Sequence, residues 1–250
     1  MKFQSFGDIS LPTFVLLHGG GLSWWSLQEI VNQLLPCYYV ITPIIDGHGE
    51  DGEETFVSIE ESSHKLIHYI DTELGGKVLA LGGLSLGAQI VVETLSLRKD
   101  LAVFAVVESA LVHPLPGIDV FTAACHLCYG LIQKPWFSRW QARAFYVPPK
   151  LHQRYFEDSL RMSWQSLINI LLGNGTYQLK PTITNTRSKV LIIVGEKELP
   201  IMKKSASSLH KAISASTLYV APEMKHGELS LANPREYVGI ISSFISGSED

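Results

Sequence analysis

The sequence has little charge, few cysteines and no long apolar run. Only 18% of its 250 residues are charged, and 24 acidic against 20 basic side chains give a net charge of −4 at pH 7. This balance provides no basic patch for a nucleic acid, so we expect no nucleic-acid partner. The first residues lack the apolar core of a signal peptide, and no window approaches the ~18 consecutive apolar residues of a membrane helix. We therefore expect a cytoplasmic protein without a membrane partner.

Three cysteines, one of them Cys37, are too few for the disulfide framework of a small secreted domain. Cys125 and Cys128 have the CxxC spacing of a zinc or redox motif. They lie in an apolar helical stretch without a second pair of ligands, which favours a buried structural pair. His64 and His68 lie four residues apart on a predicted helix and also lack a third ligand. The sequence therefore predicts no metal site.

Length and composition predict one globular domain. The chain has 250 residues, of which 46% are hydrophobic, with 20 glycines and 12 prolines dispersed along it. A domain of this size buries roughly 70–75% of its unfolded surface, which is enough for one substantial core. We therefore expect residues 1–250 to form a single domain.

Short apolar runs alternate with helix-length amphipathic segments along most of the chain. This alternation predicts an α/β fold, with a mostly parallel sheet flanked by helices on both faces. The predicted strands are Phe14–Leu17, Tyr38–Thr42, Val78–Leu81, Val103–Val107, Val190–Val194 and Thr217–Val220, with a further one at Phe3–Phe6. The predicted helices are Trp24–Leu35, Ser58–Glu73, Leu86–Arg98, Ile201–Ile213 and Pro234–Ile245. The acidic run Glu50–Glu54 predicts a solvated loop.

The most informative segment runs from Val78 to Val92, where an apolar strand breaks at Gly-Leu-Ser-Leu-Gly and a helical pattern follows. A serine at such a sharp turn adopts a strained backbone angle, and Gly83 and Gly87 lack the side chains that would collide there. Ser85 Oγ is then exposed at the N-terminus of a helix, where backbone N–H groups and the helix dipole favour a developing oxyanion. The segment therefore predicts a nucleophile.

A second motif lies upstream, where the apolar run Thr13–Leu17 ends in His18 followed by three glycines. In acyl-transfer enzymes with a strand-turn-helix nucleophile, such a loop supplies the second donor to the oxyanion. Its glycines let the backbone approach the substrate closely. We predict that the N–H groups of Gly20 and Leu86 form an oxyanion hole.

Together these motifs resemble the α/β-hydrolase family, and the resemblance covers nearly the whole chain. The segment Val40–Gly49 is similar to the family's strand and turn ending in Pro-Gly-His-Gly, with Ile44 and Asp46 in place of the usual Asp and Pro. These departures affect a turn and leave the predicted chemistry unchanged. The resemblance implies a serine nucleophile at Ser85 and no cofactor.

The alternation of strands and helices stops between Leu111 and Thr186. Residues 111–186 resemble the family's helical cap, which covers the C-terminal edge of the sheet, where ligands bind in open α/β folds. Helices are predicted at Ile118–Ile132 and Lys150–Leu172. Most of the aromatic rings here are expected to pack the cap onto the core, and one or two to line an apolar acyl pocket. These rings belong to Trp136, Trp140, Phe145, Tyr146, Tyr155, Phe156 and Trp164.

A serine hydroxyl is a weak nucleophile at neutral pH unless a neighbouring base takes its proton. In the family that the chain resembles, the partners follow in the order Ser, acid, His. His226 lies in a loop just after the last predicted strand and is the predicted general base. His18 is assigned to the oxyanion loop and His48 to a turn.

The acid of the triad has three candidates. Glu198 lies three residues after Gly195, which matches the family's Gly-x-x-Asp with Glu in place of Asp, and it is the predicted member. Glu196 in the same turn and Glu108 at the end of the preceding strand remain alternatives, because some relatives carry the acid at that strand. The alternative to a catalytic role is that all three glutamates are ordinary carboxylates at strand ends.

The sequence thus predicts a serine hydrolase that acts on carboxylic esters or thioesters of small to medium, largely apolar substrates. Ser85, His226 and Glu198 would form its triad, and an acyl-enzyme its intermediate. The same fold and triad also serve C–C bond hydrolases, lactonases, haloperoxidases and lyases, because fold alone does not fix the reaction. An alternative from another class is a non-catalytic protein that binds a small hydrophobic ligand. The intact Ser85 and His226 count against it.

Overall fold

The computed structural model describes the backbone of residues 1–247 and all of their side chains except seven in the helix of residues 118–132. Within that range one sheet has seven strands in the order β1-β3-β2-β4-β5-β6-β7. Only β1 is antiparallel to its neighbour, β3. The strands are β1 (Lys2–Phe6), β2 (Thr13–Leu17), β3 (Tyr39–Ile44), β4 (Val78–Leu84), β5 (Ala102–Glu108), β6 (Lys189–Gly195) and β7 (Ser216–Ala221).

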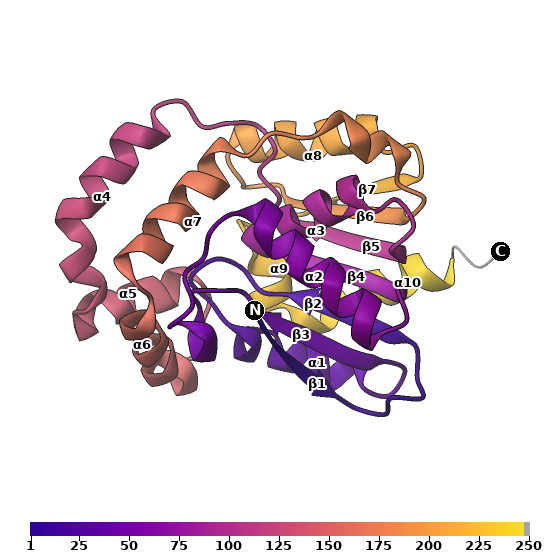
Figure 1. Cartoon of the computed structure of the whole chain (residues 1–250), viewed down its shortest axis with the longest axis horizontal. Coiled ribbons are helices and arrows are strands. Elements are labelled where there is room, and N and C mark those ends of the chain that lie inside the picture. Colours follow the sequence, from indigo (N-terminus) through magenta and orange to yellow (C-terminus); the bar gives the residue numbers. More distant parts are fainter. Residues whose placement is uncertain (248–250) are drawn as a thin grey trace.

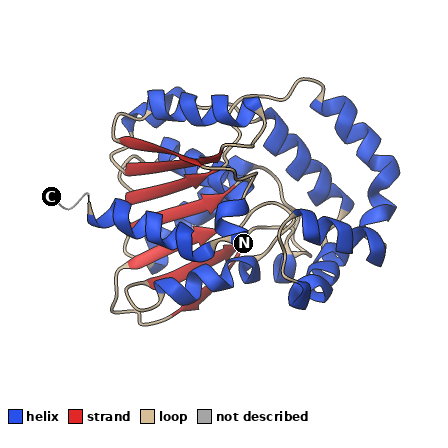
Figure 2. Ribbon diagram, turned by 180° about the vertical axis from the view of Figure 1, so that it is seen from behind, coloured by secondary structure: helices blue, strands red, loops and turns tan. Residues whose placement is uncertain are grey.

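Helices cover both faces of the sheet (Figures 1 and 2), which confirms the predicted α/β fold. Side chains of α2, α3 and α8 belong to one buried cluster, and those of α1, α9 and α10 to another. Strand β2 serves both, because Val15 and Leu17 point to the first cluster and Phe14 and Leu16 to the second. These helices are α1 (Gln28–Leu34), α2 (Ile59–Glu73), α3 (Leu86–Leu97), α8 (Pro200–Ala212), α9 (Glu228–Ala232) and α10 (Pro234–Ser246).

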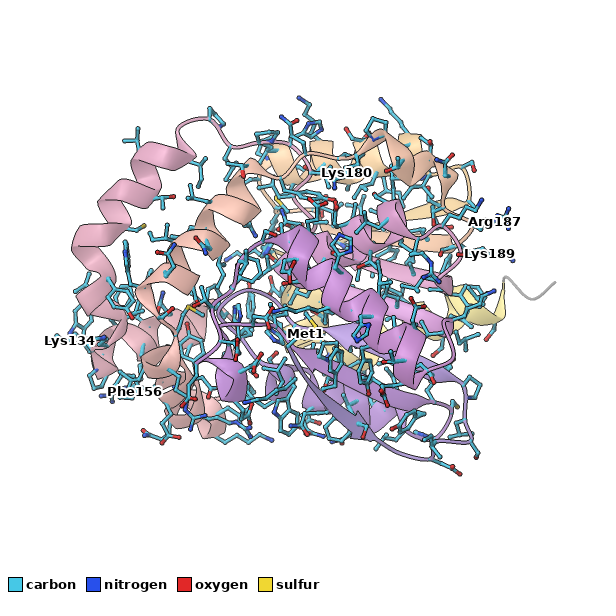
Figure 3. The ribbon with its side chains drawn as sticks, viewed as in Figure 1. Met1, Lys134, Phe156, Lys180, Arg187 and Lys189 are labelled. Atoms are coloured by element: carbon cyan, nitrogen blue, oxygen red, sulfur yellow. The ribbon has the colours of Figure 1, made fainter. Side chains whose placement is uncertain are left out.

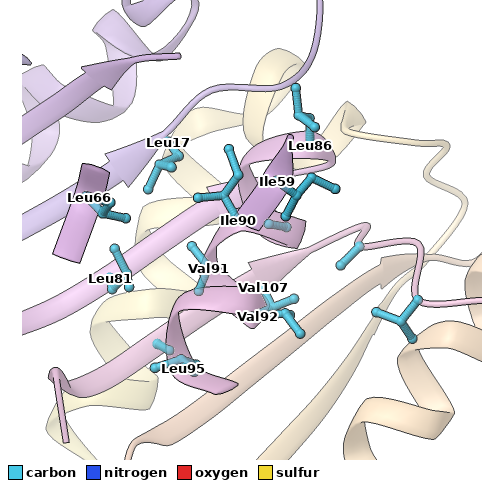
Figure 4. Close-up of a cluster of buried hydrophobic side chains, with 14 of the residues drawn as sticks. Leu17, Ile59, Leu66, Leu81, Leu86, Ile90, Val91, Val92, Leu95 and Val107 are labelled. Atoms are coloured by element: carbon cyan, nitrogen blue, oxygen red, sulfur yellow. The ribbon is translucent and has the colours of Figure 1, made fainter. Parts of the chain in front are cut away.

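Among the helices that pack against the sheet, α3 is the most deeply buried. Every residue from Leu86 to Ser96 is buried, because α3 lies between the sheet and α2. Figure 4 shows this contact, with Ile90 and Val91 of α3 near Leu81 of β4 and Leu66 of α2. Burying each such side chain stabilises the fold by about 1.5–3 kcal/mol. The helix that begins at the predicted nucleophile is therefore held rigidly.

Four helices between β5 and β6 form an insertion, which comprises α4 (Ile118–Ile132), α5 (Pro135–Ala144), α6 (His152–Arg161) and α7 (Trp164–Thr176). Figure 3 shows Lys134 and Phe156 of the insertion at the opposite end of the molecule from Arg187 and Lys189, where β6 begins. The insertion therefore lies beyond the C-terminal ends of the parallel strands.

Two predicted helices are interrupted in the structure. The segment Trp24–Leu35 begins with a 3₁₀ turn, and α1 starts only at Gln28. The segment Lys150–Leu172 contains α6 and α7, which are separated at Met162 and Ser163. Ser163 Oγ accepts the N–H of Ser166 at 3.1 Å and so caps the N-terminus of α7. The spacing of apolar residues, on which the prediction of one continuous helix depends, does not reveal this cap.

The acidic run Glu50–Glu54 is the predicted solvated loop only in its second half, where Glu53 and Glu54 are exposed. Asp51 is 2% exposed, and Gly49–Asp51 form a 3₁₀ turn. Glu50 Oε1 accepts the indole N–H of Trp24 at 3.2 Å and pairs with Arg154 of α6. The run therefore joins the sheet domain to the insertion.

Two of the seven predicted cap aromatics, both in α5, do not pack onto the core. Trp136 and Trp140 are 62% and 61% exposed, so they do not pack the insertion onto the core. Each has a ring contact with Phe137 instead, at 5.7 Å between centroids. Of the predicted Cys125 and Cys128 pair, Cys125 is half-buried and the side chain of Cys128 lies outside the described residues.

Candidate active site

Ser85 occupies the turn between β4 and α3 with φ of 53° and ψ of −112°, a conformation that costs a non-glycine residue about 1–3 kcal/mol. Two glycines make the turn sterically possible. A Cβ at Gly83 would lie 2.5 Å from the carbonyl of Gly87, and one at Gly87 would lie 2.5 Å from the His18 carbonyl oxygen. The Ser85 N–H donates to the Glu108 carbonyl at 2.9 Å, which ties the strained residue to β5.

His226 lies in the loop between β7 and α9 and reaches back to this turn. Its Nε2 is 2.9 Å from Ser85 Oγ, and its Nδ1 is 2.8 Å from Glu198 Oε2. Because an ionised carboxylate only accepts hydrogen bonds, Nδ1 carries the proton and Nε2 is free to accept the serine hydroxyl. The structure therefore brings Ser85, His226 and Glu198 into one line of two hydrogen bonds.

Glu198 is held as an ionised acceptor. Its side chain is buried, and Oε1 accepts the Ser109 hydroxyl at 2.7 Å and the Gly195 N–H at 2.8 Å. Burial alone would raise the pKa of this carboxyl, but the hydrogen bond and charge of His226 and the donors Gly195 and Ser109 hold the pKa below its ordinary value. The carboxylate thus stays charged beside the imidazole.

Within the described part of the chain, neither alternative acid has a recorded hydrogen bond to His226. Glu196 Oε2 accepts the N–H of Glu223 at 2.8 Å on the exposed side of the loop. Glu108 is fully buried at the end of β5, where Oε1 accepts the N–H of Ser230 at 3.3 Å. The geometry therefore favours Glu198 over Glu196 and Glu108 as the carboxylate partner of His226.

Glu108 has a separate effect on stability. Burial raises its pKa from 4.5 to about 7, so between these values the folded chain binds more protons than the unfolded chain. The free energy of unfolding then falls as pH rises through this window, by up to about 3 kcal/mol. We expect Glu108→Gln to be more stable than the wild type above pH 7 and equal to it below pH 4.5, as measured by urea unfolding. A stability difference that is the same at both ends of the window would contradict this.

The two predicted oxyanion donors lie side by side. A Cβ at Gly20 would be 3.6 Å from the Leu86 Cβ, so the loop after β2 touches the first residue of α3. Leu86 is the first residue of α3, so its N–H has no hydrogen-bond partner within the helix. Among the described residues, neither N–H donates a recorded hydrogen bond. Both are therefore available to an acceptor near Ser85.

The two other histidines of these motifs brace the loops. His18 Nε2 accepts the N–H of Ile45 at 3.1 Å, and its Nδ1 donates to the Gly19 carbonyl at 2.9 Å. Burial, with a smaller effect of His48, lowers the pKa of His18 to about 3. Burial lowers the pKa of His48 to about 4, and its ring lies at the wall of the cavity described next. Both rings are therefore neutral at pH 7.

A cavity of about 370 Å³ opens beside Ser85, with Gly20 and Gly21 on the same wall. Its lining is mostly apolar, and the insertion supplies most of it. The apolar side chains include Leu22, Leu115, Ile118, Phe145, Leu167 and Ile170. Two of the predicted cap aromatics, Phe145 and Tyr155, line the cavity. A mostly apolar space of this size suits a small apolar ligand.

The sequence does not predict two contacts of the site. Ser109 has φ of 56° and donates to Glu198, but nothing in its local pattern distinguishes it. Tyr146, also at positive φ, donates its hydroxyl to Glu228 Oε2 at 3.0 Å and so links the insertion to the start of α9, which follows the His226 loop. Both contacts join elements that are distant in the sequence.

Among the residues that the structure describes, no group of three or more His, Cys, Asp or Glu side chains is arranged to hold a metal ion. No helix in this part of the chain has the length and apolarity needed to cross a membrane.

Comparison with known proteins agrees with the fold. A family model described as the alpha/beta hydrolase family matches residues 14–240, and the chain therefore belongs to this family. A comparison with curated proteins yields no match. Among solved structures, the chain is similar to an esterase from Exiguobacterium antarcticum, with 18% identity over 98% of this chain and 94% of that one and a TM-score of 0.79.

Other similar structures have different named activities. The enol-lactonase from Burkholderia xenovorans LB400 is 16% identical over 98% of this chain and 96% of its own, with a TM-score of 0.79. The bromoperoxidase from Bacillus anthracis is 18% identical over 98% and 94%, also with a TM-score of 0.79. At these identities the likeness concerns the fold, so the reaction must be argued from the site.

Proposed function

We propose that this protein is a serine hydrolase that cleaves carboxylic esters or thioesters of small to medium, largely apolar substrates. The observation that supports this most is the line of hydrogen bonds from Ser85 Oγ to His226 Nε2 and from His226 Nδ1 to Glu198. It ends at a mostly apolar cavity. The esterase among the similar structures is in keeping with the proposal.

Acylation follows from this geometry. His226 Nε2 takes the hydroxyl proton as Ser85 Oγ attacks the carbonyl carbon, and Glu198 stabilises the imidazolium. The oxygen of the tetrahedral intermediate accepts the N–H groups of Gly20 and Leu86. The C–O or C–S bond then breaks, and His226 returns the proton to the leaving alcohol or thiol. An acyl ester on Ser85 remains.

Deacylation reverses the same steps with water. His226 takes a proton from a water molecule, whose oxygen attacks the acyl carbonyl. The intermediate collapses to release the carboxylic acid, and the proton returns to Ser85 Oγ. The reaction uses only side chains, backbone N–H groups and water. In this proposal the insertion acts as the cap of the cavity and holds the apolar part of the substrate.

The test is a panel of p-nitrophenyl esters from acetate to decanoate, together with a fluorophosphonate probe. Because the cavity beside Ser85 is apolar and about 370 Å³ in volume, we expect kcat/KM to be highest for medium acyl chains. The length optimum measures the depth of the cavity. A steady fall of activity from acetate onward would contradict the apolar acyl pocket.

The probe separates this proposal from a non-catalytic binding protein. A fluorophosphonate reacts covalently with an activated serine, so labelling of the wild type requires a competent nucleophile and oxyanion site. If the protein bound apolar acids but neither labelled nor turned over any ester, the binding role would replace the hydrolase. Comparing kcat/KM for matched thioesters and lactones in the same assay ranks the substrate classes.

A further inference from the structure

Asp158 of α6 is the only carboxylate among the described residues that line the cavity. The residue is 9% exposed and shares the cavity with Ser85. The steps proposed for ester cleavage give it no role. A charged group is costly on an apolar wall, since it loses water there.

The hydrogen bonds of Asp158 leave one oxygen unused. Oδ2 accepts the indole N–H of Trp25 at 2.7 Å. Among the described residues, Oδ1 accepts no recorded hydrogen bond, and its nearest recorded cation, the half-exposed Arg161, is 3.9 Å away. A pair this long and exposed contributes little. An asparagine would satisfy Trp25 as well, with no charge to desolvate, so the bond to Trp25 alone does not account for an acid here.

The surroundings of Asp158 include a second acceptor that lacks a recorded partner. Gly49 faces the carboxylate, and a Cβ there would lie 3.5 Å from Asp158 Oδ2 and closer still to Ser23 Oγ. His48, next in the chain, donates Nδ1–H to the Asp46 carbonyl at 3.0 Å. The lone pair of its Nε2 is buried without a recorded partner. This end of the cavity is therefore complementary to a group that donates a hydrogen bond.

A hydroxyl group fits this end better than an ammonium group. The single O–H of a hydroxyl is satisfied by the one free oxygen of Asp158. An ammonium has three N–H donors and would lose much of its hydration against the apolar side chains that form the rest of the wall.

We propose that Asp158 accepts a hydrogen bond from a hydroxyl group on the substrate, so that the enzyme selects hydroxylated acyl groups over plain hydrocarbon chains. This inference rests on the proposed hydrolase function and specifies its substrate class. Asp158 is a specificity-determining residue in this scheme, because it contacts the distal part of the substrate and not the carbonyl that reacts.

The experiment compares p-nitrophenyl esters of ω-hydroxy and ω-methoxy acids of equal length, in hexanoate and octanoate series, with the wild type and Asp158→Asn. The methoxy group accepts hydrogen bonds and donates none. For the chain length that reaches Asp158, we expect the wild type to prefer the hydroxy ester by about tenfold in kcat/KM, chiefly through KM. The asparagine keeps an oxygen for Trp25 and presents an amide N–H₂ to the cavity. We expect it to abolish or reverse the preference.

Ser159→Ala is the matched control. Ser159 is the next residue of α6, also lines the cavity, and donates its hydroxyl to the Tyr155 carbonyl at 2.7 Å. We expect this variant to keep the hydroxy preference. Unsubstituted hexanoate and octanoate esters show whether Asp158→Asn disturbs the cavity in general.

Several outcomes would overturn the inference. Equal rates on hydroxy and methoxy esters at every length in the wild type would do so, as would an unchanged preference in Asp158→Asn. A loss in that variant that is equal for all esters would show a structural role for Asp158. If the wild type preferred ω-amino esters to ω-hydroxy esters, the group that Asp158 binds would be a cation and not a hydroxyl. If the wild type cleaved no ester and took no fluorophosphonate label, the proposed function itself would fail, and the inference with it.

Discussion

Replacing Ser85 by alanine is expected to lower ester turnover by about 10⁴–10⁶ in kcat and to abolish fluorophosphonate labelling. The oxygen that His226 Nε2 contacts at 2.9 Å is then missing, so no acyl-enzyme forms. Alanine at the positive φ of residue 85 keeps about the same backbone strain, and the fold is expected to survive. Active-site labelling detected on a gel and steady-state kinetics measure the two effects.

Ser159→Ala again serves as the control, because this serine lines the same cavity but has no contact with His226. It is expected to label like the wild type. Full labelling of Ser85→Ala would show that another residue is the nucleophile. Circular dichroism of both variants shows whether a loss of activity reflects unfolding.

Replacing Glu198 by glutamine is expected to lower kcat by about 10²–10⁴ with little change in KM. Glutamine keeps the shape but has no charge to stabilise the imidazolium, and its amide can hold His226 in the wrong tautomer. The donors to Oε1, Ser109 and Gly195, also lose a carboxylate partner. Kinetics on the best ester of the panel measure this effect.

Two neighbouring carboxylates are the controls. Glu196→Gln and Glu108→Gln are expected to stay near wild-type activity, because the recorded hydrogen bonds of these carboxylates go to Glu223 and Ser230 and not to His226. A large loss in Glu108→Gln with Glu198→Gln nearly unaffected would move the acid to the end of β5. The hydrolase proposal would survive that result, whereas Glu198 would leave the site.

The local turns could be predicted from the sequence because steric limits act between neighbours along the chain. Only glycine fits at positions 83 and 87, where a Cβ would meet backbone at 2.5 Å, and the Gly-Leu-Ser-Leu-Gly pattern reports this directly. The alternation of strands and helices likewise follows from side-chain burial on two faces of the sheet. The sequence also predicts that Ser85, His226 and Glu198 meet, and their side chains lie within hydrogen-bonding distance. Their catalytic roles stay predictions.

Contacts between distant segments could not be predicted. The Trp25 indole and Asp158 are 133 residues apart in the chain, and Ser109 and Glu198 are 89 apart. No periodicity encodes such pairs, because they depend on where the insertion lies relative to the sheet. The burial of Asp51 and the exposure of Trp136 have the same origin, since residue type alone predicts the opposite for each.

The proposed reacting groups and most of the cavity wall come from different parts of the fold, which affects how the substrate of this protein could change. Ser85, His226, Glu198 and the loop of Gly20 all follow strands of the sheet, and backbone contacts such as Gly87 against His18 fix them to one another. The insertion supplies most of the cavity wall, Asp158 included, and none of the proposed reacting groups. Exchange of helices α4–α7 for those of a similar hydrolase would therefore alter which acyl groups are accepted while the bond-breaking machinery stays in place.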